Sequence, residues 1–249
     1  MKREHVSGDY DRMFIEGGHE GVYGLPYRHS CYFPLFRAVR RELAKRGARR
    51  LLEVGCGTGA FAHYILKESS MGYAGFDFSP AAVEMAVRRT ERGELFRVGD
   101  AREPSSYDRP HDAIVCTEVL EHIDADRRVV SQWAPGTVCV CSVPNFDADN
   151  HVRFFPGEAE IRTRYGDLIA VEFIRQVRKP ELTNISLASY VRAVRWNRYS
   201  PRRLAQILGL TSFDKGGGWF VFAGRRTDVR ECGSDGDDAV VPNNRKSAQ

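Results

Sequence analysis

The feature that most constrains this chain is a run of three alternating glycines at Gly55, Gly57 and Gly59. The run directly follows a short apolar segment at residues 51–54 and directly precedes a helix-like stretch that begins at Ala60. Glycine permits positive φ angles and has no Cβ, so a strand can turn sharply here while a ligand lies against the bare backbone. The helix that follows offers unpaired N–H groups and partial positive charge. The run therefore predicts a site for a nucleotide-like cofactor.

Three acidic residues narrow the identity of that cofactor. Glu53 lies inside the apolar segment, and because an unpaired buried carboxylate is costly, we expect it to accept hydrogen bonds from the loop or the cofactor. Asp77 ends the next predicted strand, roughly 20 residues on, where a carboxylate can accept both hydroxyls of a ribose. Asp100 follows a third predicted strand, where an acceptor can read an adenine amino group. Together they favour a ligand that contains adenosine.

A nicotinamide dinucleotide is the rival cofactor. The spacing of Gly55, Gly57 and Ala60 also satisfies the looser fingerprint of dinucleotide sites. That alternative gives no obvious reason for Glu53, or for a cluster of two glutamates and a histidine at residues 118–122.

Four motifs carry a resemblance to a known family, and they follow the family's order over roughly residues 48–145. They are Glu53-x-Gly55-x-Gly57-x-Gly59, Gly75-x-Asp77-x-Ser79-Pro80, Gly99-Asp100-Ala101 and Cys116-Thr117-Glu118-Val119-Leu120-Glu121-His122. In these motifs the chain resembles class I S-adenosylmethionine-dependent methyltransferases of the small-molecule type.

The resemblance implies S-adenosyl-L-methionine as the cofactor. It places Asp77 on the ribose, Phe78 on the adenine face, Asp100 near the adenine amine, and the glycine turn under the methionine moiety. The cofactor-binding residues expected from the motifs are Glu53, Gly55, Cys56, Gly57, Gly59, Asp77, Phe78, Asp100, Ala101, Thr117 and Glu118. In related enzymes the segment before the first helix closes over the cofactor. Arg28 is the candidate there for the methionine carboxylate, since a guanidinium fork suits a carboxylate; the alternative is an exposed arginine on a flexible arm.

Hydrophobic periodicity predicts strands that alternate with helices, which favours an α/β fold with a doubly wound, mostly parallel sheet. The family resemblance implies seven strands in a Rossmann-like arrangement. The predicted strands are 50–54, 72–77, 94–98, 112–116, 137–143, 167–177 and 219–224, and the predicted helices are 31–46, 59–68, 80–91, 118–130, 157–165, 185–196 and 201–208. We divide the chain into an N-terminal lid and helix (1–46), a methyltransferase domain (47–225) with a substrate-facing insertion at 178–215, and a disordered polar tail (226–249).

Composition limits the partners. The net charge of +4 is too small to imply a nucleic-acid partner by itself. Six cysteines without a CxxC pair are typical of reduced thiols in a cytoplasmic protein. The sequence shows no secretory signal and no apolar run long enough to span a membrane. We expect a cytoplasmic monomer or homodimer that acts on a small-molecule methyl acceptor.

Two histidines are the candidate catalytic residues, because transfer to a hydroxyl requires a group that accepts its proton. His122 follows the fourth predicted strand and His151 follows the fifth. If residues 118–130 are helical, then Glu118, Glu121 and His122 share one face at spacings of i, i+3 and i+4. Three hypotheses stay open: these residues brace the cofactor pocket, a histidine is the general base, or the cluster and His151 bind a divalent cation. We assign no metal ligand from the sequence.

The sequence therefore predicts methyl transfer to a hydroxyl, or less readily an amine, of a small metabolite or natural-product intermediate. The first alternative is a metal-assisted RNA-terminal 2′-O-methyltransferase, a group that the two-Glu, two-His pattern resembles; the chain departs from that pattern at Ile123, where a second histidine is typical. The second alternative is a catalytically silent partner protein that only binds the cofactor.

Overall fold

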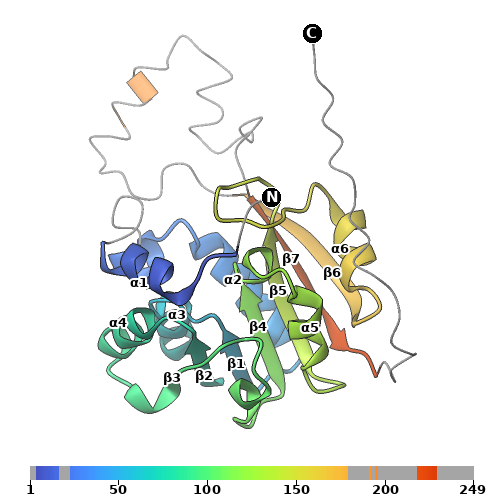
Figure 1. The fold of residues 1–249 in the computed structure, drawn as a ribbon, viewed down its shortest axis with the longest axis horizontal. Coiled ribbons are helices and arrows are strands. Elements are labelled where there is room, and N and C mark those ends of the chain that lie inside the picture. The colour runs from blue at the N-terminus through green and yellow to red at the C-terminus, as the bar shows by residue number, and fades with distance from the viewer. Residues whose placement is uncertain (1–3, 17–22, 179–190, 192–193, 196–217, 229–249) are drawn as a thin grey trace.

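The computed structural model describes residues 4–16, 23–178, 191, 194–195 and 218–228 (Figure 1). Its strands are β1 (Arg50–Val54), β2 (Gly72–Asp77), β3 (Phe96–Val98), β4 (Ala113–Thr117), β5 (Val138–Pro144), β6 (Ile169–Arg178) and β7 (Gly218–Arg226). Its α-helices are α1 (Ser7–Ile15), α2 (Phe33–Lys45), α3 (Ala60–Glu68), α4 (Pro80–Thr90), α5 (Asp126–Ser131) and α6 (Glu158–Tyr165). Short 3-10 helices are η2 (Tyr27–His29), η3 (Gly93–Leu95), η4 (Pro104–Tyr107) and η5 (Leu120–His122).

The strands form one seven-stranded sheet in the order β3-β2-β1-β4-β5-β7-β6. The pairs among β1 to β5 are parallel, whereas β7 runs antiparallel to both β5 and β6. The predicted mostly parallel α/β sheet is therefore confirmed. The strand order reverses between β1 and β4, and ligands of open α/β sheets bind at the carboxyl ends of the strands at such a point.

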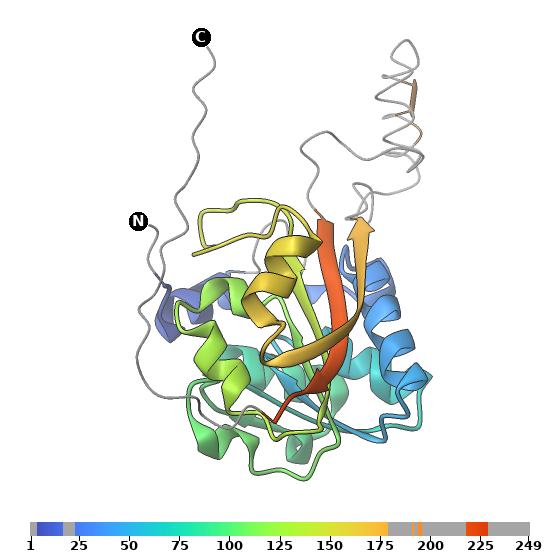
Figure 2. The ribbon, with the colours of Figure 1, turned by 90° about the vertical axis from the view of Figure 1, so that its right-hand side faces the viewer.

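The sheet buries both faces, because successive strand residues point to opposite sides. In β1, Leu51 packs into a core with α2, α3 and α4, and Leu52 packs into a second core with α5 and α6. Figure 2 shows this layering at the β6 edge of the sheet, which faces the viewer, with α6 on one side of β6 and β7 and α2 on the other. The result is a three-layer α/β/α sandwich whose strand ends are left to build a site.

Most predicted elements differ from the structure only at their ends, but one is wrong. The predicted helix at 118–130 is broken into η5 and α5, and Glu118 adopts a positive φ of 58° instead of a helical one. A residue in the left-handed region cannot continue an α-helix, so the i, i+3, i+4 argument for one shared face does not hold. For the N-terminal helical lid that we predict, no helix bounds are given before Cys31, and the structure has α1 at residues 7–15.

Several predictions fall on residues that the structure does not describe. The helix expected at 201–208 lies outside the described ranges, as do most of the helix expected at 185–196, most of the insertion at 178–215 and all but the start of the tail. Among the described residues, no helix combines the length and the apolar character needed to cross a membrane.

Candidate functional site

A cavity of about 1220 Å³ lies at the carboxyl ends of β1, β2 and β4, where the strand order reverses. Most of the residues singled out from the sequence line it, although they come from separate parts of the chain. Those that line it are Glu53, Gly55, Cys56, Gly57, Asp77, Phe78, Asp100, Ala101, Thr117, Glu118, His122 and His151. Arg28 and Gly59 are absent from its wall.

The glycine turn joins β1 to α3, and its three glycines serve different purposes. All three have positive φ, at 70° for Gly55, 48° for Gly57 and 74° for Gly59. A Cβ on Gly59 would lie 2.9 Å from the Cα of Ala86, so this glycine permits α3 to pack closely on α4. A Cβ on Gly57 would meet no atom within 4 Å. Gly57 therefore offers bare backbone to the cavity, whereas Gly59 is needed for helix packing and not for ligand contact.

Asp77, at the end of β2, holds the glycine turn in place. Its Oδ2 accepts a hydrogen bond from the N–H of Gly57 at 2.8 Å, and its Oδ1 accepts one from the N–H of Ser79 at 2.9 Å. Burial raises the pKa of Asp77 to about 6, although these two N–H groups oppose the shift. A carboxylate offers about four lone-pair positions, so acceptor capacity remains for a ligand's hydroxyl groups.

The segment after β3 is fastened by an arginine. Arg102 donates to both oxygens of Asp100, with 2.6 Å from its terminal nitrogen to Oδ2, and it also pairs with Glu4 at 3.1 Å. Burial of Asp100 opposes ionisation, but the hydrogen bonds from Arg102 outweigh it and lower the pKa of that carboxyl. Ala101 accepts a hydrogen bond from the Tyr107 hydroxyl at 2.7 Å. Asp100 therefore lines the cavity as a carboxylate whose charge is partly neutralised by the Arg102 guanidinium.

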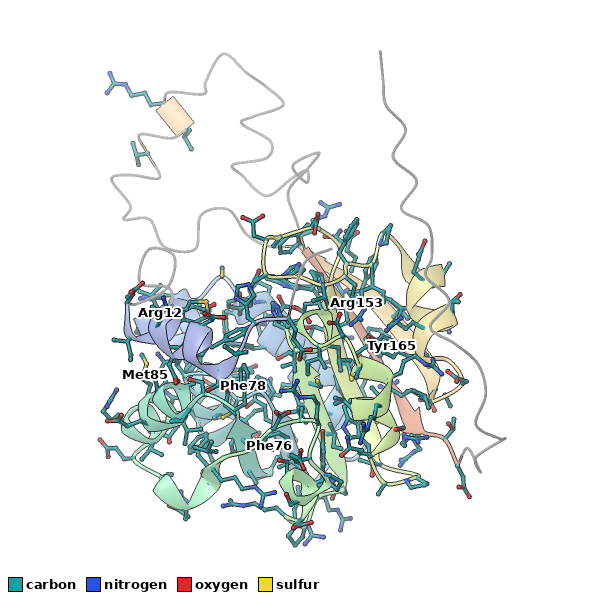
Figure 3. All side chains as sticks on the ribbon, in the orientation of Figure 1. Arg12, Phe76, Phe78, Met85, Arg153 and Tyr165 are labelled. Carbon is teal, nitrogen blue, oxygen red and sulfur yellow. The ribbon has the colours of Figure 1, made fainter. Side chains whose placement is uncertain are left out.

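Helix α1, for which the sequence predicts no bounds, covers one side of the cavity. Asp11 accepts hydrogen bonds from the hydroxyl of Ser79 at 2.5 Å and from the N–H of Ala81 at 3.2 Å, at the first turn of α4. The Tyr10 ring meets Phe78 edge-on at a centroid distance of 5.1 Å, and Figure 3 shows the labelled Phe78 below α1. The signal was weak but present, since Tyr10 and Phe14 are spaced by four residues. Helix α1 thus contacts both the first turn of α4 and the residue that follows β2.

Glu53 finds its partner within the sheet. The hydroxyl of Tyr73 on β2 donates to Glu53 Oε2. The Tyr73 side chain passes over Gly75 to reach it, and a Cβ on Gly75 would lie 2.5 Å from the Tyr73 hydroxyl oxygen. Burial raises the pKa of Glu53 to about 8, with a further contribution from the charge of Asp77. Burial likewise raises the pKa of the neighbouring Cys56 thiol. Both groups are therefore mostly uncharged at neutral pH, which removes the cost of an unpaired buried charge.

His122 and His151 lie beside each other at the wall of the cavity, with ring centroids 5.1 Å apart. Nδ1 of His122 is 2.8 Å from the carbonyl oxygen of Asn150, and Nδ1 of His151 is 3.3 Å from that of Phe146. A carbonyl oxygen only accepts, so in each ring the proton sits on Nδ1 and the lone pair on Nε2. Burial lowers the pKa of His122 to about 4, so this imidazole is neutral at physiological pH.

Glu118 does not join the histidines as the helical interpretation required. Its left-handed backbone turns the carboxylate toward the sheet, where Trp219 Nε1 donates to Oε2 at 2.5 Å and the Ser142 hydroxyl donates to Oε1 at 3.0 Å. The carboxylate therefore ties the end of β4 to β5 and β7. Glu121, in contrast, lies next to the imidazoles: Glu121, His122 and His151 each offer one ligand atom within 4.8 Å of the others.

Arg28 lies away from the cavity. Its guanidinium pairs with Glu68 at the end of α3, at 2.5 Å, and also donates to the Tyr27 hydroxyl at 3.2 Å. The hydrogen bond from Arg28 lowers the pKa of Glu68 and raises that of Arg28 itself. The assignment of Arg28 to the methionine carboxylate is therefore corrected: in this structure the guanidinium holds η2 against α3.

Replacing Arg28 with alanine is expected to leave the affinity for S-adenosylhomocysteine within about twofold of the wild type, since the variant loses only an exposed ion pair. Isothermal titration calorimetry with the purified protein measures this directly. A loss of tenfold or more would show that the arginine reaches the ligand in the bound state and would restore the original assignment.

Comparisons with known proteins identify the family of the chain. The family described as "Methyltransferase domain" matches residues 27–208. Trans-aconitate 2-methyltransferase of Mycobacterium tuberculosis strain H37Ra is 30% identical over 125 residues, which are 47% of this chain and 46% of the relative. The chain thus matches about half the length of these curated relatives.

Solved structures share the fold at low identity. The (4+2)-cyclase SpnF superposes with a TM-score of 0.60 at 17% identity, covering 90% of this chain and 98% of that one. The N-methyltransferase NodS from Bradyrhizobium japonicum WM9, in complex with S-adenosylhomocysteine, has a TM-score of 0.51 at 18% identity, covering 77% and 85%.

The structure itself fits an adenosyl cofactor, because Gly57 exposes bare backbone and Asp77 retains acceptor capacity beside it. The family match covers well over half of the 249 residues. The chain therefore belongs to the methyltransferase-domain family.

Proposed function

We propose that the protein methylates a hydroxyl group of a small metabolite, and that His122 and His151 handle the proton of that hydroxyl. The observation that carries this proposal is the pair of imidazoles in the cavity wall, each with Nδ1 directed at a backbone carbonyl. A hydroxyl keeps its proton at neutral pH, so its methylation needs a group that accepts the proton or makes it easier to lose. The neutral imidazole of His122 carries a lone pair on Nε2 that is suited to that task.

On the cofactor side of the site, the protein needs only to bind and orient the methyl donor. Bound S-adenosylmethionine supplies a methyl group on a good leaving group, so alignment of the acceptor provides much of the rate. Gly57, Asp77, Phe78, Asp100 and Thr117 would hold the cofactor, because they line the cavity on the side of β1, β2 and β4. Their part is to bind and orient, and the histidines act on the acceptor.

The wall near the histidines favours a small acceptor over RNA. Asp147 and Asp149 lie in the loop that leads to His151 and line the cavity. The two arginines that line it are both engaged by carboxylates, Arg12 by Asp9 and Arg102 by Asp100 and Glu4. Carboxylates at this place repel a phosphate backbone, which Lys and Arg would attract. The curated relatives are named for trans-aconitate, which agrees with a small acceptor.

One observation supports the alternative, a protein that binds the cofactor without transferring a methyl group. A fold of this kind is not tied to one reaction, since the similar structure of SpnF is described as a cyclase. The histidine pair nevertheless gives this cavity a group that a purely structural cofactor would not require.

The test uses labelled S-adenosylmethionine with panels of hydroxyl, amine and carboxylate small molecules and with RNA. For the acceptor that is methylated, His122→Ala and His151→Ala are each expected to lower kcat by about 100-fold or more, the usual contribution of such a group. His111→Ala is the matched control, because its Nδ1 also faces a backbone carbonyl, that of Arg109, but the ring does not line the cavity. Affinity for S-adenosylhomocysteine should stay unchanged in all three variants.

Three outcomes would count against the proposal. Wild-type rates in both cavity variants would remove the histidines from the chemistry. Transfer to RNA alone would favour the RNA-terminal activity. Binding of S-adenosylmethionine without transfer to any acceptor in the panel would favour the silent partner protein.

A further inference from the structure

A carboxylate beneath the histidine pair has no explanation in the proposed reaction. The Glu121 side chain is fully buried, and neither of its oxygens has a hydrogen-bond partner in the structure. A buried carboxylate without donors is costly, so the fold retains a strained group that something must compensate.

The charge of Arg153 acts on Glu121, but its guanidinium makes no hydrogen bond with that carboxyl. Arg153 donates to the backbone carbonyls of Leu120, Ile123 and Asp124 and lies 3.3 Å from the Asp126 carboxylate. Figure 3 labels Arg153 on the loop that follows β5. Arg153 is therefore used to fix the chain around η5, and the Glu121 oxygens face two imidazoles instead.

The imidazoles present a suitable arrangement to a metal ion. Nε2 of His122 lies 3.8 Å from Glu121 Oε1, and the ligand atoms of Glu121, His122 and His151 all lie within 4.8 Å of one another. A cation with bonds of about 2.1 Å holds neighbouring ligands roughly 3–4 Å apart, so small rotations of the side chains would close the site. Hydrogen bonds from Nδ1 to backbone carbonyls are also the usual way in which a metal-binding histidine is oriented.

We propose that Glu121, His122 and His151 form a binding site for one divalent transition-metal cation, with a set of two nitrogens and one oxygen. Imidazole and carboxylate ligands together suit Zn²⁺, Co²⁺, Fe²⁺ or Mn²⁺ more than Ca²⁺, which prefers six or more oxygens. Three protein ligands leave at least one coordination position open toward the cavity that both imidazoles line. Glu118 is not a ligand, because Ser142 and Trp219 engage its carboxylate.

The open position gives the cation a role, which rests on the proposed function. A hydroxyl bound to a divalent cation loses its proton more easily, and the proton leaves to solvent. The oxygen lone pair then forms the bond to the methyl carbon, and the electrons of the C–S bond stay on sulfur, which yields S-adenosylhomocysteine. The histidines would thus act on the hydroxyl through the metal.

Metal binding is tested on the full-length protein after removal of bound metal with a chelator. Titration with Co²⁺, followed by its visible absorption, is expected to show one equivalent bound, and Zn²⁺ should displace it. Glu121→Gln and His151→Ala should each weaken Co²⁺ binding by about 100-fold or more, since loss of a direct ligand exceeds the effect of an outer-shell change. His111→Ala should bind Co²⁺ with the same affinity as the wild type.

Folding is checked separately by S-adenosylhomocysteine affinity, which all variants should retain. Glutamine has nearly the shape of glutamate, so the metal-free Glu121→Gln variant should melt close to the wild type while losing the rise in Tm that Zn²⁺ causes. Absence of saturable Co²⁺ binding, or equal binding in Glu121→Gln and the wild type, overturns the site. Methyl transfer that persists in chelator would refute the role of the cation and leave the proposed function standing. Metal binding without transfer to any hydroxyl would refute the proposed function and leave the metal site standing.

Discussion

Asp77→Asn is expected to weaken S-adenosylhomocysteine binding by about 100-fold. Hydrogen bonds to a charged group contribute about 1.5–3 kcal/mol each, and each 1.4 kcal/mol is a factor of ten in affinity. Both carboxylate oxygens of Asp77 already accept backbone N–H groups, from Gly57 and Ser79. Asparagine has only one acceptor oxygen, so its NH₂ group would oppose one of those N–H donors. The variant therefore loses charge at the cavity and disturbs the glycine turn together.

Asp112→Asn is the matched control for this variant. Asp112 performs the same task at the opposite end of the sheet, where its Oδ1 accepts the N–H groups of Arg49 at 2.9 Å and Arg50 at 3.1 Å. It does not line the cavity. Calorimetry should therefore show unchanged ligand affinity for Asp112→Asn, even if its Tm falls. Similar losses in both variants would mean that Asp77 acts only through the stability of the fold.

The same titration has an expected pH dependence. Because burial raises the pKa of Asp77 to about 6, its carboxylate is ionised above that pH and protonated below it. Wild-type affinity for S-adenosylhomocysteine should therefore fall as the pH is lowered from 7 to 5, and Asp77→Asn should show a much smaller change. An identical pH profile in the two proteins would contradict the assignment of Asp77 as an acceptor for the ligand.

The fold and the cofactor side of the site were predictable from the sequence because their signals are local. Apolar runs mark the strands, and Gly57 and Asp77 occur where two of those strands end. Parallel strands bring such ends to one edge of the sheet, so the topology alone places these residues together. Ser79, which follows the same strand end, caps α4 with its hydroxyl, which accepts the N–H of Ala82 at 3.0 Å.

The parts that could not be predicted depend on which distant group a side chain meets. Arg28 pairs with Glu68, which stands 40 positions later, and no local pattern distinguishes that partner from a ligand carboxylate. The positive φ of Glu118 is rare outside glycine, and it separates this residue from the histidine cluster. Propensity and periodicity read Glu118 as helical because they carry no information about Trp219, which lies 101 positions later and holds the carboxylate.

Glu53→Gln is expected to remove a large pH dependence of stability. Burial raises the pKa of Glu53 from its ordinary value of 4.5 to about 8 in the folded protein. Between these values the folded state holds a proton that the unfolded state releases, so the free energy of unfolding falls as the pH rises. At about 1.4 kcal/mol per pKa unit, the loss across this window is about 3–5 kcal/mol. Glutamine stays neutral throughout, and its carbonyl can still accept the hydrogen bond from the Tyr73 hydroxyl.

Urea unfolding of the wild type and the variant at pH 5.5 and pH 8 measures this difference, and Glu53→Gln should gain stability relative to the wild type at the higher pH. Glu42→Gln is the control, because hydrogen bonds from Lys45 and Arg46 overcome the effect of burial and lower the pKa of Glu42. Glu42 is thus ionised in both folded and unfolded states across this pH range, and its replacement should lower stability equally at both pH values. If the wild type and Glu53→Gln lose the same free energy of unfolding from pH 5.5 to pH 8, then Glu53 is ionised in the folded protein. The cavity would then carry a negative charge beside the glycine turn, contrary to the raised pKa of Glu53.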